Sequence, residues 1–184
     1  MILYTADLHF GHANVVRMDH RPFADVGEMN EYLIKRWNDR VQNNDDVYIV
    51  GDFWYKGAKL PQDILRRLNG RKHLIVGNHD GKLLKNSTAM SYFETVNDLL
   101  TITDGDKQVV LCHYPLAEWP RYYRNAYHVY GHIHNNKNQA YYTMAKEDRA
   151  LNAGCMLNNY TPASLQELIR NNKIFQEEDR KGMG

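Results

Sequence analysis

The chain has 184 residues, of which 43% are hydrophobic and 24% are charged, the ordinary mixture of one globular domain. Its formal net charge of +1 does not indicate a strongly basic surface for nucleic acid. No apolar run approaches membrane-spanning length, and no signal peptide precedes the first strand-like segment. We therefore expect a cytoplasmic protein without membrane contact.

The first part of the chain alternates between strand-like and helix-like segments. A strand is expected at Ile2–Ala6, a helix at Glu28–Val41, a strand at Asp46–Val50, a short helix between Pro61 and Gly70, and a strand at His73–Val76. This βαβαβ order predicts a parallel sheet with helices on its faces.

The second part begins with strands. Two strands, Glu94–Thr103 and Lys107–Cys112, flank Asp104-Gly105-Asp106, which is typical of a hairpin turn. Further strands are expected at Tyr127–Tyr130, Gln139–Ala145 and Ala150–Asn152, and a last helix begins at Pro162. Residues 176–184 are charged and predict a flexible tail, which leaves 1–175 as a single domain.

Two cysteines, Cys112 and Cys155, occur without the spacing of a zinc site or a disulfide framework. We expect both to be reduced and buried.

Polar residues of the kinds that bind metals follow five of these strands. They are Asp7 and His9, then Asp52, then Asn78 with His79 and Asp80, then His113, and finally His132 and His134. Because ligands bind at the carboxyl ends of strands in open α/β sheets, a shared sheet would bring these residues to one rim. Residues i and i+2 of an extended chain point to the same side, so each Asp-x-His or His-x-His pair faces one cavity. Each cluster alone is compatible with an ordinary turn or a structural histidine, but the ordered set favours a metal site.

This ordered set resembles the calcineurin-like metallophosphoesterase family, in its small single-domain bacterial and phage form. The resemblance covers the chain from the first strand to past its middle, and no ligand of the family pattern is missing. It implies an α/β fold (α+β by some schemes), a two-sheet β-sandwich flanked by helices.

The resemblance also implies two metal sites that share one ligand. One metal takes Asp7, His9, Asp52 and His134, and the other takes Asp52, Asn78, His113 and His132, so that Asp52 bridges them. Mixed imidazole and oxygen ligands favour Mn, Fe, Zn, Co or Ni over a pure Mg²⁺ or Ca²⁺ site. We take manganese as the first expectation.

The implied reaction is hydrolysis of a small phosphodiester or phosphomonoester by a hydroxide that bridges the two metals. His79 matches the family position of the general acid that protonates the leaving oxygen, and Asp80 is expected to hold its imidazole. Excess positive charge at the two metals would attract the anionic substrate.

Several residues outside this set have more than one interpretation. His12 reaches the substrate, supports the first metal site, or is an ordinary loop or helix-start histidine. Arg17, Arg21, Arg121 and Arg124 are phosphate-binding candidates or solvated surface charges, and Trp119–Arg124 is a substrate-side wall or a cover for the core. We assign no function to His20, His73 or His128.

Two alternative functions remain open. One is a nuclease for short nucleic acid, although the near-neutral charge makes binding of long nucleic acid unlikely. The other is a non-catalytic metal-binding interaction scaffold of the same fold. A scaffold could lose His79 or a metal ligand, whereas this chain has all of them.

Overall fold

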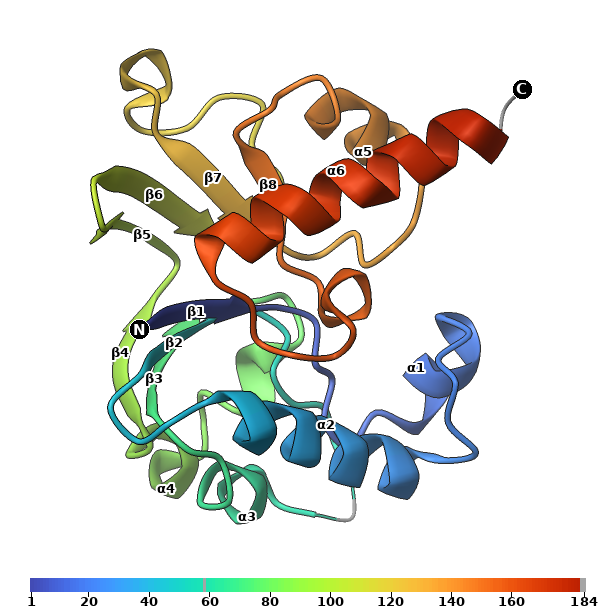
Figure 1. The fold of residues 1–184 in the computed structure, drawn as a ribbon. Helices are drawn as coiled ribbons and strands as arrows, with labels where there is room; N and C mark the ends of the chain where they lie inside the picture. The colour runs from blue at the N-terminus through green and yellow to red at the C-terminus, as the bar shows by residue number, and fades with distance from the viewer. Residues whose placement is uncertain (58, 183–184) are drawn as a thin grey trace.

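A computed structural model describes residues 1–57 and 59–182. Within these residues, eight strands form two four-stranded sheets, in the orders β1-β2-β3-β4 and β5-β6-β7-β8. The sheets lie one above the other and are flanked by helices (Figure 1). The expected fold class, a two-sheet α/β sandwich flanked by helices, is confirmed.

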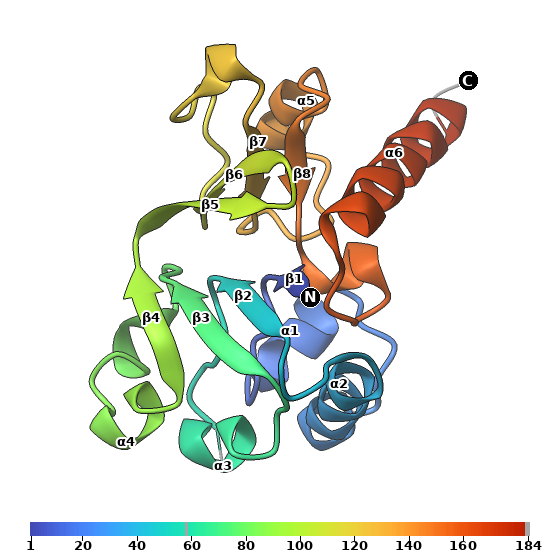
Figure 2. The same ribbon diagram turned by 60° about the vertical axis from the view of Figure 1, so that its left-hand side comes forward.

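The first sheet is parallel throughout, as the alternating pattern predicts. Its strands are β1 (Ile2–Thr5), β2 (Asp46–Val50), β3 (Arg71–Ile75) and β4 (Phe93–Asn97). The connections contain α1 (Ala13–Met18), α2 (Val26–Arg40), α3 (Pro61–Leu65), the 3-10 turn η1 (Asp80–Lys82) and α4 (Ser87–Met90). Helices α2, α3 and α4 cover the face that points away from the second sheet (Figure 2).

The second sheet contains β5 (Leu99–Asp104), β6 (Lys107–Cys112), β7 (Tyr127–Tyr130) and β8 (Ala150–Asn152). Strands β5 and β6 form the expected antiparallel hairpin, and β6, β7 and β8 are parallel to one another. The other elements are η2 (Tyr122–Arg124), α5 (Gln139–Met144), η3 (Cys155–Asn158) and α6 (Leu165–Gly182).

The two sheets share a buried core. Side chains of alternate residues on β1, β2 and β3 face the second sheet, and they form one cluster with the inner residues of β6, β7 and β8. Tyr4, Val50 and Ile75 come from the first sheet, and Leu111 and Val129 come from the second. This packing fixes the two sheets relative to each other and therefore fixes the ends of their strands.

The expected single strand Glu94–Thr103 is wrong. The segment forms β4 in the first sheet and β5 in the second, with Asp98 between them. The chain crosses between the layers at this point (Figure 2). A run of β-prone residues predicts extended backbone but not its pairing partner, so the change of sheet leaves no signal in the pattern.

The strand expected at Gln139–Ala145 is also wrong, because this segment forms the helix α5. The side chain of Asn138 caps the helix by accepting a hydrogen bond from the backbone N–H of Tyr141, at 3.1 Å. Tyr141 and Met144 are three residues apart and buried on the same face of the helix. The capping asparagine and the three-residue spacing of the buried side chains favour the helix.

The C-terminal segment also differs from the expectation. Helix α6 starts at Leu165 rather than Pro162, and it runs through the expected domain boundary at residue 175 to Gly182. Asp179 is buried and pairs with Lys137 at 2.8 Å, which attaches this part of α6 to the loop before residue 139. Residues 183–184 of that expected tail lie outside the described residues.

Two smaller expectations concern cysteines and membranes. Both Cys112 and Cys155 are free and buried, as predicted. Along residues 1–57 and 59–182, no helix is long and apolar enough to cross a membrane.

Candidate metal centre

The seven expected metal ligands lie together at the carboxyl ends of five strands. Asp7 and His9 follow β1, Asp52 follows β2, Asn78 follows β3, His113 follows β6, and His132 and His134 follow β7. Three of these strands belong to the first sheet and two belong to the second. The site therefore lies where the ends of both sheets meet, rather than at the rim of one shared sheet.

Four of the seven side chains form a first group. Ligand atoms of Asp7, His9, Asp52 and His134 all lie within 4.8 Å of one another. The Nε2 atoms of His9 and His134 are 3.0 Å apart, and His9 Nε2 is 3.6 Å from Asp52 Oδ2. Asp7 Oδ1 is 3.8 Å from His134 Nε2. This is the set expected for the first metal.

The other side chains form a second group around Asn78. Its Oδ1 atom is 2.9 Å from His113 Nε2 and 2.9 Å from His132 Nδ1. His113 Nε2 is also 3.5 Å from Asp52 Oδ2. Asp52 therefore contacts both groups.

The backbone of these ligands is unusual. Asp7, His9, Asp52, His132 and His134 have φ angles between 51° and 71°, in the left-handed region that residues other than glycine rarely adopt. Such a conformation costs roughly 1–3 kcal/mol per residue and persists where the surrounding structure enforces it. Its repetition at five of the seven candidate ligands favours a functional role for these strand ends.

Two glycines make room for the ligands. Gly51 has a φ of +87°, and a Cβ atom there would lie 2.1 Å from His113 Nδ1. At Gly131, a Cβ atom would lie 2.9 Å from Asp7 Oδ2. Only glycine lets the strand ends of the two sheets approach this closely.

The donor set fits a divalent metal ion. Among the described residues, Asp7 Oδ2 is a buried carboxylate oxygen without a hydrogen-bond partner. Burial raises the pKa of the Asp7 carboxyl and lowers that of the His9 imidazole, because both charged forms lose their solvation. A cation favours the carboxylate and the neutral imidazole, the two forms that bind metals.

Hydrogen bonds fix the orientation of two imidazole ligands. His113 Nδ1 donates to the carbonyl oxygen of Val50 at 2.9 Å, which leaves the lone pair of Nε2 facing Asp52. His134 Nδ1 donates to Asp19 Oδ2 at 2.7 Å, which leaves its Nε2 facing the first group. Both rings therefore present a metal-binding nitrogen to the centre.

Asp19 is itself held by Arg21. The buried guanidinium of Arg21 donates to Asp19 Oδ2 at 3.1 Å, to the carbonyl oxygen of Asp7 at 2.8 Å and to that of Leu8 at 3.0 Å. Burial would raise the pKa of Asp19, but the hydrogen bond from His134 and the charge of Arg21 hold that pKa below its usual value. Arg21 is thus an internal support, and neither a phosphate ligand nor a surface charge.

His79 lies beside the first group. Its side chain is exposed, and its ring centroid is 5.4 Å from that of His9. Its backbone N–H donates to Asp52 Oδ1 at 2.8 Å, which ties the loop after β3 to the ligand that joins the two groups. The ring is therefore close to the candidate metals and open to a substrate.

Asp80 has a different contact from the one expected. Its two oxygens accept hydrogen bonds from the backbone N–H groups of Asp52, Gly77 and Phe53, at 2.9, 2.9 and 3.0 Å. The hydrogen bonds of the described residues include none between Asp80 and the His79 ring. Because its oxygens are occupied, Asp80 joins the loops after β2 and β3 instead of orienting the imidazole.

Other residues singled out in the sequence lie outside the centre. Arg17, Arg121 and Arg124 are exposed. Trp119 is buried and donates to the carbonyl oxygen of Ala126 at 2.9 Å, which supports the core-covering alternative for that part of Trp119–Arg124. His128 is buried within the second sheet, where burial lowers its pKa to about 4.

Three residues near the centre were missed in the sequence. They are Asp19, Tyr55, whose ring centroid lies 4.2 Å from that of His12, and Tyr114, whose ring centroid lies 4.7 Å from that of His132. Each is an isolated polar or aromatic residue in a loop, so no motif in the sequence identifies it as part of the site.

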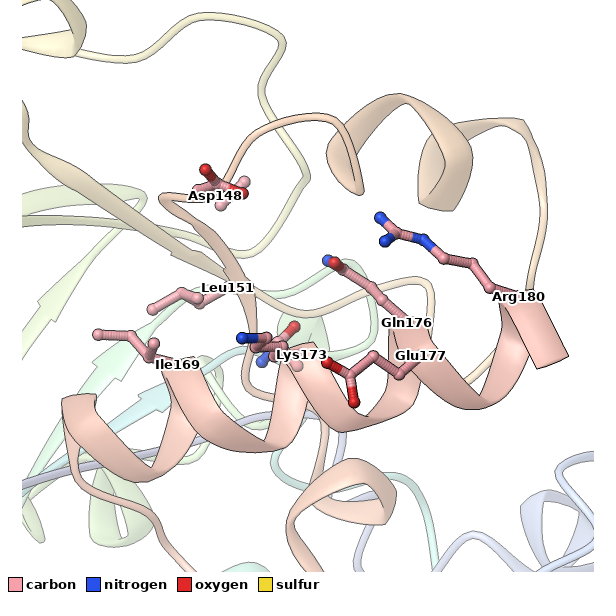
Figure 3. Close-up of a pocket in the computed structure, with 9 residues that line it drawn as sticks. Asp148, Leu151, Ile169, Lys173, Gln176, Glu177 and Arg180 are labelled. Atoms are coloured by element: carbon pink, nitrogen blue, oxygen red, sulfur yellow. The ribbon is translucent and has the colours of Figure 1, made fainter.

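A separate hollow of about 340 Å³ lies between α6 and β8 (Figure 3). Apolar Leu151 and Ile169 line it together with side chains of both charges, such as Lys173 and Glu177. Its lining contains none of the seven ligands, so it is distinct from the metal centre.

Comparisons with known proteins agree with the geometry. The model of the calcineurin-like phosphoesterase superfamily domain matches residues 1–166. An uncharacterised protein of Methanocaldococcus jannaschii is 32% identical over 171 residues, which cover 92% of this chain and 89% of the relative. The gene 66 protein of Mycobacterium phage D29 is 32% identical over 129 residues, which cover 62% of this chain and 63% of the relative.

A solved structure supports the fold alone. The protein of unknown function from Aquifex aeolicus superposes with a TM-score of 0.73 at 24% sequence identity. The superposition covers 92% of this chain and 98% of that one.

Proposed function

Because the chain belongs to the calcineurin-like phosphoesterase superfamily, we propose that it hydrolyses small phosphate esters with two divalent metal ions. The observation that carries the proposal is the convergence of Asp7, His9, Asp52 and His134, which come from three strand ends in two sheets. If these were ordinary turn residues, their ligand atoms would not be expected to lie within 4.8 Å of one another in a buried site.

The proposed ligands divide as the two groups do. Asp7, His9, Asp52 and His134 would hold one ion, and Asp52, Asn78, His113 and His132 would hold the other. When bound, such ions lower the pKa of water and stabilise negative charge on phosphoryl oxygens. The mixture of nitrogen and oxygen ligands favours transition metals, with manganese as our first choice.

His79 is the proposed general acid. Its exposed imidazole lies next to the first group, where it can give a proton to the oxygen of the leaving alcohol. Asp52 accepts from the His79 backbone N–H, so the loop that carries the acid is fixed to a proposed metal ligand. This contact would keep the loop that carries the proton donor close to the ions that the two groups would hold.

The proposal is tested with purified protein, Mn²⁺ and two phosphodiesters. One is bis-para-nitrophenyl phosphate, whose leaving group needs no proton, and the other is an alkyl diester, whose leaving group does. EDTA should abolish both activities. His79→Ala should lower turnover of the alkyl diester by roughly 10²–10⁴-fold and affect the nitrophenyl ester much less.

Three results would contradict the proposal. Activity that persists in EDTA would exclude metal-dependent hydrolysis. Full metal loading without turnover on a broad panel of esters would favour the interaction scaffold. Cleavage of oligonucleotides in preference to small esters would instead assign the chemistry to a nuclease.

A further inference from the structure

His12 occupies an uncommon position for a histidine, the N-cap of α1. Its Nδ1 atom accepts a hydrogen bond from the backbone N–H of Val15 at 2.9 Å. Ser, Thr, Asp and Asn are the usual N-cap residues, and each would satisfy this N–H without an imidazole ring. Capping alone therefore does not explain why a histidine is here.

The cap fixes the tautomer of the ring. An imidazole nitrogen that accepts a hydrogen bond carries no proton, so the proton of His12 is on Nε2. No hydrogen bond of the described residues uses this Nε2–H. His12 thus presents one N–H donor with a defined position and no partner within the described chain.

The ring lies at the edge of the metal centre. Its centroid is 5.5 Å from that of the ligand His9, 6.3 Å from that of His79 and 4.2 Å from that of Tyr55. The His12 ring is half-buried, so part of it packs near the rings of His9, His79 and Tyr55 and the rest is accessible to solvent.

Neighbouring backbone contacts hold the ring in this place. Gly11, with a φ of +79°, donates its N–H to Asn30 Oδ1 at 3.0 Å, and the backbone N–H of Tyr55 donates to the carbonyl oxygen of Phe10 at 2.9 Å. The loop that carries His12 is therefore attached to α2 and to the segment that carries Tyr55. A group fixed in this way loses little conformational entropy when it binds a ligand.

We propose that His12 donates its Nε2–H to a non-bridging oxygen of the phosphoryl group bound at the metal centre, as a catalytic residue beside His79. This inference rests on the proposed function. The two histidines have separate tasks, because His79 transfers a proton to the leaving oxygen while His12 keeps its proton and stabilises charge on the phosphoryl group. The ligand class is a phosphate ester or inorganic phosphate.

Two variants separate the donor from the cap. His12→Asn keeps a good N-cap and removes the Nε2–H, whereas His12→Ala removes both. His20→Asn is a matched control, since His20 is exposed in the following loop and its φ of 52° is one that asparagine tolerates. Metal content, thermal unfolding, binding of inorganic phosphate and kcat/KM are measured for each variant and for the wild type.

We expect His12→Asn to unfold at the wild-type temperature, to hold the same metal content, and to lose about tenfold in phosphate affinity and in kcat/KM. His12→Ala should show the same loss together with a lower unfolding temperature, and His20→Asn should match the wild type. Wild-type phosphate affinity and kcat/KM in His12→Asn would overturn the inference. Loss of metal in His12→Asn would also overturn it, because it would assign His12 to support of the metal ligands.

The phosphate measurement keeps this inference separate from the proposed function. If the wild type hydrolyses no ester but binds phosphate more tightly than His12→Asn does, the proposed reaction fails while the donor role of His12 stands. If the metal-loaded wild type does not bind phosphate, the donor role fails, whatever the outcome for hydrolysis.

Discussion

At the scale of single residues, the support behind His134 gives the clearest prediction. Asp19→Asn keeps an oxygen that can accept from His134 Nδ1, but it removes the negative charge that faces this ring and the buried Arg21. A carboxylate partner raises the basicity of a metal-binding imidazole, and its loss typically weakens metal affinity by about 10–100-fold. We expect a loss in this range for Mn²⁺, measured by competition with a chelator.

The control for this variant is Asp39→Asn. Asp39 is half-exposed on α2 and pairs with Lys35 four residues earlier in the chain, so its removal should change neither metal affinity nor fold. Equal Mn²⁺ affinity in Asp19→Asn and Asp39→Asn would show that the carboxylate does not support the ligand.

The residue scale is also where the sequence was most informative about the site. The seven candidate ligands are predicted by type and by their place after a strand, and the structure brings all seven together. Asp19 and Tyr55 could not be predicted in the same way. Their role depends on which loops become neighbours, and this is set by packing between α1, α2 and the two sheets.

At the scale of elements, Asp80 joins the loops that follow β2 and β3. Asp80→Ala would leave three buried backbone N–H groups without an acceptor, at Asp52, Phe53 and Gly77. Each such loss costs about 1–3 kcal/mol, and partial relaxation makes about 3 kcal/mol a reasonable total. We expect the free energy of unfolding in urea to fall by this amount, with weaker metal binding.

Asp106→Ala is the matched control for that variant. Asp106 is exposed at the tip of the β5–β6 hairpin, and its one ion-pair partner among the described residues is its exposed neighbour Lys107, so its removal should be nearly neutral. Similar unfolding free energies for Asp80→Ala and Asp106→Ala would mean that the loops are held by other contacts.

Elements were predictable where hydrophobic pattern and local chemistry agreed. The strands 46–50, 107–112 and 127–130 have the expected bounds because each is a short β-prone run between turn residues. The single strand expected at 94–103 is wrong because extended backbone can pair in either sheet. The strand expected at 139–145 is wrong because Tyr141 and Met144, which are buried and three residues apart, fit one face of a helix.

At the scale of the whole molecule, the metal centre joins the two sheets. Asp7, His9, Asp52 and Asn78 follow strands of the first sheet, and His113, His132 and His134 follow strands of the second. The buried cluster between the layers already holds the sheets together, so the fold does not depend on metal alone. Ions bound across the junction would nevertheless stabilise the folded state, because an unfolded chain has no such site.

This linkage predicts a thermal unfolding temperature that rises with Mn²⁺ concentration. Binding to the native state adds RT ln(1 + [Mn²⁺]/Kd), about 2.7 kcal/mol at a hundredfold excess over Kd, so the temperature should keep rising with the logarithm of the concentration. Asp52→Asn should lose most of this gain, because Asp52 contacts both ligand groups. Mg²⁺ at equal concentration should have a smaller effect, since it disfavours imidazole ligands. An unfolding temperature that is the same in EDTA and in excess Mn²⁺ would show that no ion spans the two sheets.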